Sequence, residues 1–129
     1  AQQVPTGRAE RILVVEDDVL VRQSLVVQLE RLGYTIVPAG SAAEALQIIA
    51  ENPPFDLLFT DVVLPGEMNG RQLVEVALEQ HPGLRVLLAS GYSEDPLMRE
   101  RRLQNPMSFL SKPFRRTELA ETIRKILEQ

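Results

Sequence analysis

Hydrophobic and polar positions follow two different periods along this chain. Five short apolar runs show no polar alternation, a pattern typical of strands that are buried on both faces of a parallel sheet. These runs are Ile12–Val15, Tyr34–Val37, Phe55–Thr60, Arg85–Ala89 and Ser108–Leu110. We therefore expect each of them to form a strand.

Between the runs, apolar residues recur with helical spacing. Leu25, Leu29 and Leu32 lie at i, i+4 and i+7, which places them on one face of a helix. The later stretches carry similar stripes, namely Ala42, Ala45, Leu46 and Ile49; Leu73, Val76 and Ala77; and Leu119, Ile123, Ile126 and Leu127. A fourth helix over Ser93–Asn105 has the weakest pattern, because this stretch is polar and contains Pro96.

Capping residues support the same division. Asp18 is expected to be the N-cap of the first helix, Gly33 to end it, and Asn69 to cap the third. Ser41 with Glu44 predicts a capping box for the second helix. Strands that alternate with helices in this way predict an α/β fold, a doubly wound five-stranded parallel sheet flanked by five helices.

Length and composition narrow the class of protein. The chain has 129 residues, the size of one domain. Residues 1–10 are small and polar and predict a flexible tail or linker, which leaves residues 11–129 as the folded domain. The absence of cysteine excludes disulfides and thiolate metal sites.

Charge and hydropathy argue against two kinds of partner. The net charge is −4, and the arginines around Glu100 indicate a solvated helix face, so we expect no direct contact with nucleic acid. No apolar run approaches the ~18 residues of a membrane span, so no membrane contact is expected of this domain.

Polar residues gather where the predicted strands end, which is where ligands bind in open α/β sheets. They are Glu16, Asp17 and Asp18 after the first strand, Asp61 after the third, Ser90 and Gly91 after the fourth, and Lys112 and Pro113 after the fifth. Carboxylates within ~4 Å of one another repel by roughly 4 kcal/mol at an effective dielectric constant near 20, so they need a cation. Oxygen ligands favour Mg²⁺, and a carboxylate, a divalent ion and a lysine together indicate phosphoryl transfer.

Four segments at these strand ends resemble the response-regulator receiver domains of two-component signalling. They read ILVVEDD, LLFTDVVLPGEMNG, VLLASGY and FLSKPF, and the resemblance covers roughly residues 11–128. It implies a flavodoxin-like sheet with the strand order 2-1-3-4-5.

The resemblance also implies a role for each matching residue. Asp61 would accept the phosphoryl group, with Lys112 and Ser90 on the phosphoryl oxygens and the backbone N–H groups near Val63 and Gly91 assisting. The implied cofactor is Mg²⁺, bound by Asp17, Asp61, the Val63 carbonyl and, through water, Glu16.

Further implied features are a switch formed by Ser90 and Phe109 and a cis peptide bond before Pro113. The sequence departs from the common pattern at two of these positions. Glu16 stands where Asp is more frequent, so its reach to the metal is longer. Phe109 stands where Tyr is frequent, so it has no hydroxyl to donate.

The expected function is therefore that of a phosphoacceptor domain that signals through its fourth helix, fifth strand and fifth helix. The implied donor is a histidine kinase or a histidine phosphotransfer domain, the expected location is cytoplasmic, and the expected state is a monomer or weak dimer. Such a domain promotes its own phosphorylation but is not by itself a turnover enzyme.

The sequence is compatible with three kinds of parent protein. We favour the receiver of a hybrid histidine kinase, in which case the parent protein is a kinase. The first alternative is a stand-alone single-domain regulator. The second is an independent Mg²⁺-dependent phosphatase, which is disfavoured because such enzymes of the haloacid dehalogenase type need Asp-x-Asp after the first strand, and position 19 is valine.

Overall fold

Five parallel strands alternate with helices in the computed structural model, which describes residues 6–52, 54–91 and 107–128. The fourth helix predicted over Ser93–Asn105 lies outside these residues. The described elements are β1 (Arg11–Val15), α1 (Val19–Arg31), β2 (Thr35–Ala39), α2 (Ala42–Glu51), β3 (Leu57–Asp61), α3 (Gly70–Gln80), β4 (Arg85–Ser90), β5 (Met107–Ser111) and α5 (Arg116–Leu127). The strand order is β2-β1-β3-β4-β5, so the predicted fold is confirmed.

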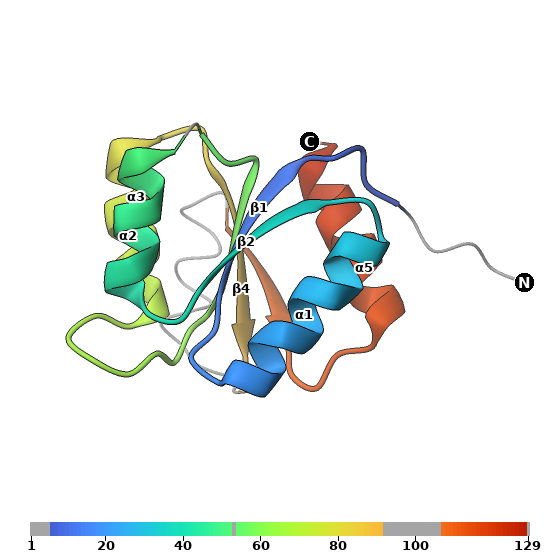
Figure 1. The fold of residues 1–129 in the computed structure, drawn as a ribbon, viewed down its shortest axis with the longest axis horizontal. Coiled ribbons are helices and arrows are strands. Elements are labelled where there is room, and N and C mark those ends of the chain that lie inside the picture. Colours follow the sequence, from blue (N-terminus) through green and yellow to red (C-terminus); the bar gives the residue numbers. More distant parts are fainter. Residues whose placement is uncertain (1–5, 53, 92–106, 129) are drawn as a thin grey trace, which may run out of the picture.

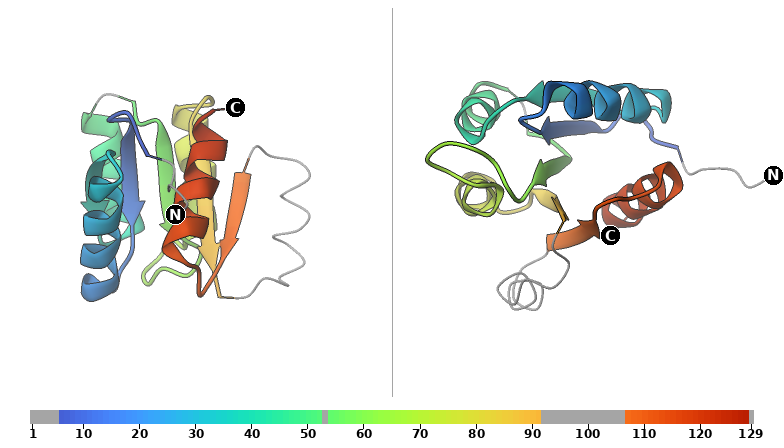
Figure 2. Two further views of the ribbon diagram at one scale, coloured as in Figure 1. Left: turned by 90° about the vertical axis from the view of Figure 1, so that its right-hand side faces the viewer. Right: turned by 90° about the horizontal axis from the view of Figure 1, so that it is seen from below.

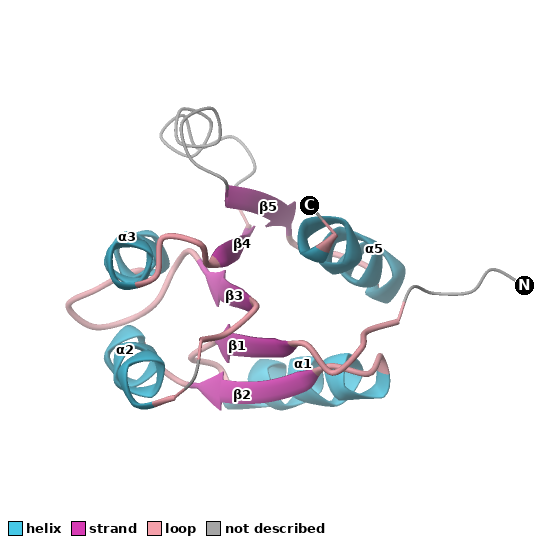
Figure 3. Ribbon diagram, turned by 90° about the horizontal axis from the view of Figure 1, so that it is seen from above, coloured by secondary structure: helices cyan, strands magenta, loops and turns pink. Residues whose placement is uncertain are grey.

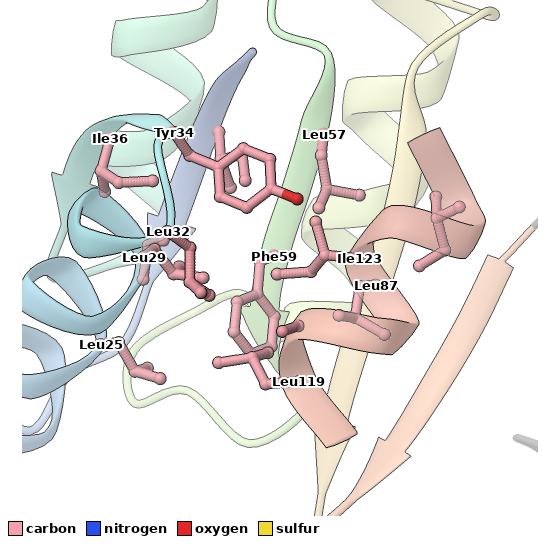
Figure 4. Packing of buried hydrophobic residues seen from close by; sticks show 14 of the residues in the cluster. Leu25, Leu29, Leu32, Tyr34, Ile36, Leu57, Phe59, Leu87, Leu119 and Ile123 are labelled. Atoms are coloured by element: carbon pink, nitrogen blue, oxygen red, sulfur yellow. The ribbon is translucent and has the colours of Figure 1, made fainter. Parts of the chain in front are cut away.

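The sheet is the middle of three layers (Figure 1). Helices α1 and α5 cover one face, and α2 and α3 cover the other (Figure 3). Alternate strand residues pack into two hydrophobic clusters, one on each face. Figure 4 shows the α1 and α5 side, where Leu29, Phe59 and Ile123 meet between the helices and the sheet. None of the described helices is both long and apolar enough to cross a bilayer.

The order of the strands positions one end of the sheet for binding. After β1 the chain moves outward to β2, then crosses back to form β3 on the other side of β1. The carboxyl ends of β1 and β3 therefore lie at the switch point where doubly wound sheets open a crevice. In the left view of Figure 2 the arrowheads of β1 and β5 point to this same, lower edge.

Several predicted strand boundaries were wrong by one or two residues. Strand β2 begins at Thr35 and runs through Pro38 to Ala39, where the prediction had stopped at Val37. An edge strand tolerates proline because one side of its backbone has no neighbour to donate to. Strands β3 and β4 continue one residue further than predicted, so Asp61 and Ser90 are the last residues of their strands.

The predicted caps are present. The Asp18 side chain accepts hydrogen bonds from the N–H groups of Leu20 and Val21, and Asn69 forms a complete capping box with Gln72. Ser41 accepts a hydrogen bond from the Glu44 N–H at 3.2 Å, which is one half of the predicted box. These caps fix where α1, α2 and α3 begin at the functional edge of the sheet.

Residues 6–10 are hydrogen-bonded to the turn between α1 and β2, at the opposite end of the strands from the polar residues. The N–H groups of Gly7 and Ala9 donate to the carbonyls of Leu32 and Gly33, at 2.6 and 2.8 Å. Arg124 of α5 forms an ion pair with Glu10 at 2.8 Å, and both side chains are mostly buried. This part of the expected tail is therefore tied to α1 and α5, while residues 1–5 lie outside the described chain.

We predict that Arg124→Ala lowers the free energy of unfolding by about 1.5–3 kcal/mol, the usual contribution of a hydrogen bond to a charged group. Burial alone raises the pKa of Glu10, but hydrogen bonds from Arg124 and the Arg8 N–H outweigh it and hold the pKa below 4.5. A carboxyl group with a lowered pKa stabilises the fold above its unfolded-state value, and this contribution is lost as the pH falls below about 4.5. Denaturant titrations at pH 7 and pH 4 should show that acidification lowers the free energy of unfolding less in Arg124→Ala than in the wild type.

The exposed Lys125, the next residue along α5, provides the control. Lys125→Ala should match the wild type at both pH values. If Arg124→Ala and Lys125→Ala unfold at the same denaturant concentration, residues 6–10 are not held by this ion pair.

Candidate functional site

Asp61 lies at the centre of the polar group at the carboxyl edge of the sheet. Its Oδ2 atom is 2.5 Å from the Lys112 Nζ atom, and its Oδ1 atom accepts a hydrogen bond from the Val63 N–H at 3.1 Å. The main-chain carbonyl of Asp61 accepts a hydrogen bond from the Thr60 hydroxyl at 3.0 Å. The two carboxylate oxygens therefore contact different neighbours, which holds the carboxylate in one orientation.

Lys112 reaches the site from the turn that follows β5. Its main-chain N–H donates to the Ser90 carbonyl at 2.8 Å, which continues the pairing of β4 with β5. Its ammonium group contacts a second carboxylate, with 3.5 Å between Nζ and the Glu16 Oε1 atom. One cation therefore bridges acids from β3 and from the β1–α1 turn, and the Lys112–Pro113 peptide that follows is cis.

Glu16 is a buried acid, with 4% of its surface exposed. Its N–H donates to the Ala39 carbonyl at 3.1 Å, and its Oε2 atom accepts from the Asp18 N–H at 3.2 Å. Burial raises the pKa of Glu16, and the Asp17 side chain and the negative charge of Asp61 raise it further, against the opposing effects of the Asp18 N–H and of Lys112. Asp17 itself is exposed.

The pKa of Lys112 is also raised, although burial alone would lower it. The hydrogen bond and charge of Asp61, together with the charge of Glu16, outweigh the cost of burial. The edge of the sheet therefore holds a surplus of negative charge that one ammonium group only partly neutralises.

An apolar recess lies beside these charges, between α1 and the turn that precedes α5. Phe59 and Phe114 form one wall, with ring centroids 6.3 Å apart and ring planes at 87°. Val21 and Leu25 of α1 also line the recess. A hydrophobic lining lowers the local dielectric and strengthens every charge interaction at the rim.

The remaining predicted residues lie around this centre. Ser90 is buried at the end of β4, and Gly91 follows it in an exposed position. The Val63 side chain is 64% exposed, while its N–H faces Asp61. Phe109 lies in the middle of β5, paired with Leu88, and packs against the cluster on the α2 and α3 face.

Sequence comparison assigns the chain to a family. Residues 12–124 match the response regulator receiver domain. The chain belongs to this family. The receiver is 38% identical over 119 residues to the sensor kinase CckA of Brucella abortus and 36% identical over 118 residues to the response regulator receiver protein CpdR of the same bacterium. Each match covers 92% of this chain, but 12% of CckA and 97% of CpdR.

Solved structures agree with this assignment. A CheY-like receiver domain protein from Methanospirillum hungatei superposes with a TM-score of 0.83 at 32% identity, covering 92% of this chain and 94% of that one. The receiver domain of the hybrid histidine kinase CckA gives a TM-score of 0.76 at 34% identity, covering 91% and 98%. The family match over residues 12–124 includes all the polar groups at the carboxyl edge of the sheet.

Receiver domains generally use Mg²⁺ for phosphorylation, and the acids of this receiver fit such an ion. No three His, Cys, Asp or Glu side chains gather into a metal cage within the described ranges. Mg²⁺ does not require one, because proteins commonly bind it through one or two carboxylates while it keeps several waters. Glu16, Asp17 and Asp61 supply hard oxygen atoms and an unbalanced negative charge.

Three residues that shape the site did not stand out in the sequence. Gly70, the first residue of α3, lies so close to Asp61 that a Cβ atom there would be 1.9 Å from the Asp61 carbonyl oxygen. Arg22 of α1 donates to the Glu16 carbonyl at 2.8 Å and lies next to Gly40. Only Gly70 carried a signal, since glycine right after an N-cap suggests close packing rather than helix propensity.

Proposed function

We propose that the receiver accepts a phosphoryl group on Asp61 from a phosphohistidine. A carboxylate oxygen of Asp61 attacks phosphorus, the P–N bond to the histidine breaks, and the imidazole leaves with the bonding electrons. The observation that carries this proposal is the 2.5 Å contact between Asp61 and Lys112 at the switch point of the sheet. It fixes the nucleophile beside a cation that is suited to the incoming phosphoryl oxygens.

The neighbouring groups support the reaction. When bound by Asp17, Asp61, the Val63 carbonyl and, through water, Glu16, Mg²⁺ would offset charge on the phosphoryl oxygens. In the phosphorylated state, Lys112, the Ser90 hydroxyl and the N–H groups near Val63 and Gly91 would bind these oxygens. Inward movement of Ser90 followed by Phe109 would carry the change to β5 and α5.

The donor is proposed to dock on the start of α1 and the turn before α5. Val19, Leu20 and Val21 are exposed apolar residues on this first turn, with Leu20 at 77% exposure. Phe114 lines the same recess as Val21. A histidine kinase or histidine phosphotransfer domain could cover this apolar rim while its phosphohistidine points at Asp61.

We also propose that the parent protein is a hybrid histidine kinase, with the first residues of this chain serving as the linker into the receiver. The 38% identity to the kinase CckA supports it, although CpdR, at 36%, is a receiver of about this length. Reading the gene upstream of Ala1 tests the idea. A kinase core in the same frame would support it, and a start codon directly before this chain would contradict it.

Acetyl phosphate with Mg²⁺ provides the test of the acceptor. We expect intact-mass measurement to show one added phosphoryl group per chain, and no addition in EDTA. Borohydride reduction followed by peptide mapping should place the acyl phosphate at Asp61. Labelling that is independent of Mg²⁺, or that maps to another residue, would refute the proposal.

A further inference from the structure

Arg22 connects the helix that borders the site to the turn that carries its acids. Its own N–H makes the first helical bond of α1, to the Asp18 carbonyl at 2.9 Å, so its backbone is fixed. From there its guanidinium reaches back six positions, and Nη1 donates to the Glu16 carbonyl at 2.8 Å. The side chain therefore links the first turn of α1 to the start of the β1–α1 turn.

The Glu16 main chain is held from both sides. Its N–H donates to Ala39 at the end of β2, and its carbonyl accepts from Arg22. Because a peptide bond is planar, fixing the Glu16 carbonyl also fixes the N–H of Asp17 and the direction in which the chain leaves Glu16. One guanidinium contact therefore fixes the main chain from which both neighbouring acids extend.

Gly40 leaves space for the Arg22 guanidinium. It lies in the turn between β2 and the Ser41 cap of α2. A Cβ atom at this position would be 3.0 Å from Arg22 Nη1 and 3.7 Å from Arg22 Cζ. The φ angle of Gly40 is not in the left-handed region, so the backbone would accept alanine, and the added methyl group would require the Arg22 guanidinium to shift by a few tenths of an ångström.

We propose that Arg22 is a positioning residue for divalent-ion binding, an inference that rests on the proposed function. Arg22 holds the Glu16–Asp17 peptide in place, so the Glu16 carboxylate keeps its contact with Lys112 and the Asp17 side chain extends from a fixed main chain. The acids are then arranged before an ion arrives, and binding does not have to order the turn. Partners that orient metal ligands typically change metal affinity by 10–100-fold when they are removed.

The sign of the effect separates this role from a charge effect. A guanidinium close to the acids repels a cation, so removing its charge alone would tighten Mg²⁺ binding. Loss of positioning weakens binding instead. Isothermal titration calorimetry of Mg²⁺ into Arg22→Met, well below its melting temperature, should give a Kd about tenfold higher than the wild type. Arg22→Lys keeps the positive charge but loses the planar guanidinium. Its Kd for Mg²⁺ should lie between those of the wild type and Arg22→Met.

Gly40→Ala tests the same geometry with Arg22 in place. The added methyl group should push the guanidinium away from the Glu16 carbonyl and raise the Kd in the wild-type background. In the Arg22→Met background Gly40→Ala should not change the Kd further, because the guanidinium that the methyl group would displace is absent. Gly83→Ala is the matched control, since a Cβ atom there meets nothing within 4 Å, and its Kd should be unchanged.

These measurements distinguish the positioning role of Arg22 from the proposed Mg²⁺ site itself. If folded Arg22→Met binds Mg²⁺ as tightly as the wild type or more tightly, Arg22 does not position the acids. An equal effect of Gly40→Ala in both backgrounds would likewise overturn the role of Arg22. If the wild type and Asp17→Asn give the same Kd, the acids do not bind the ion, and both the proposed site and this inference fail.

Discussion

Asp61→Asn is expected to abolish phosphorylation by acetyl phosphate, leaving no added mass in the presence of Mg²⁺. The substitution keeps the size and planarity of the side chain, and its amide oxygen can still accept the 3.1 Å hydrogen bond from the Val63 N–H. An amide is not a nucleophile toward phosphorus, and it lacks the negative charge that attracts Lys112 and a divalent ion. The fold should survive while the chemistry is lost.

A neighbouring acid provides the matched control. Asp18 is exposed, and its side chain caps α1 by accepting from Leu20 and Val21. Asparagine is an equally good N-cap, so Asp18→Asn should change stability by only a few tenths of a kcal/mol, about the difference between good caps. We expect its phosphorylation to match the wild type. Persistent single-site labelling in Asp61→Asn would assign the acceptor to another residue.

Gly70→Ala is expected to cause the largest loss of stability among the single substitutions considered. A Cβ atom at this position would be 1.9 Å from the Asp61 carbonyl oxygen and 3.0 Å from the Val62 Cα atom. Both are main-chain atoms at the end of a central strand, so neither can move aside cheaply. Overpacking of this kind should cost about 3 kcal/mol or more.

Thermal unfolding should show this as a decrease in Tm of about 10 °C. Gly83→Ala, which meets nothing within 4 Å, should unfold close to the wild-type temperature. Because the clash is with Asp61 itself, any Gly70→Ala protein that remains folded should also be phosphorylated more slowly. A variant with the wild-type Tm would show that α3 can shift away from the strand without cost.

The fold, and the meeting of Asp61 with Lys112 at one edge of the sheet, could be predicted from the sequence because both depend on local patterns. Buried parallel strands are continuous apolar runs, and polar residues directly after them meet at one edge of the sheet whatever the details of packing. That reasoning brought Asp61 and Lys112 together across 51 positions, and the structure places them in contact.

The supporting geometry could not be predicted in the same way. The contact between Arg22 and the Glu16 carbonyl depends on a long side chain turning back across a turn, and no spacing rule distinguishes it from a solvated arginine. The approach of Gly70 to Asp61 depends on where α3 docks on β3. The end of β2 was misplaced because proline argues against a strand until the strand is known to lie at the edge.

Pro38 also affects how the receiver meets other chains. An edge strand with free N–H and C=O groups can recruit another strand and extend the sheet from one molecule to the next. Strand β2 forms one edge of this sheet, and Pro38, an exposed residue within it, has no N–H with which to continue such pairing. The same proline that interrupts the sequence pattern therefore disfavours the pairing of a further strand, from this chain or another, at this edge.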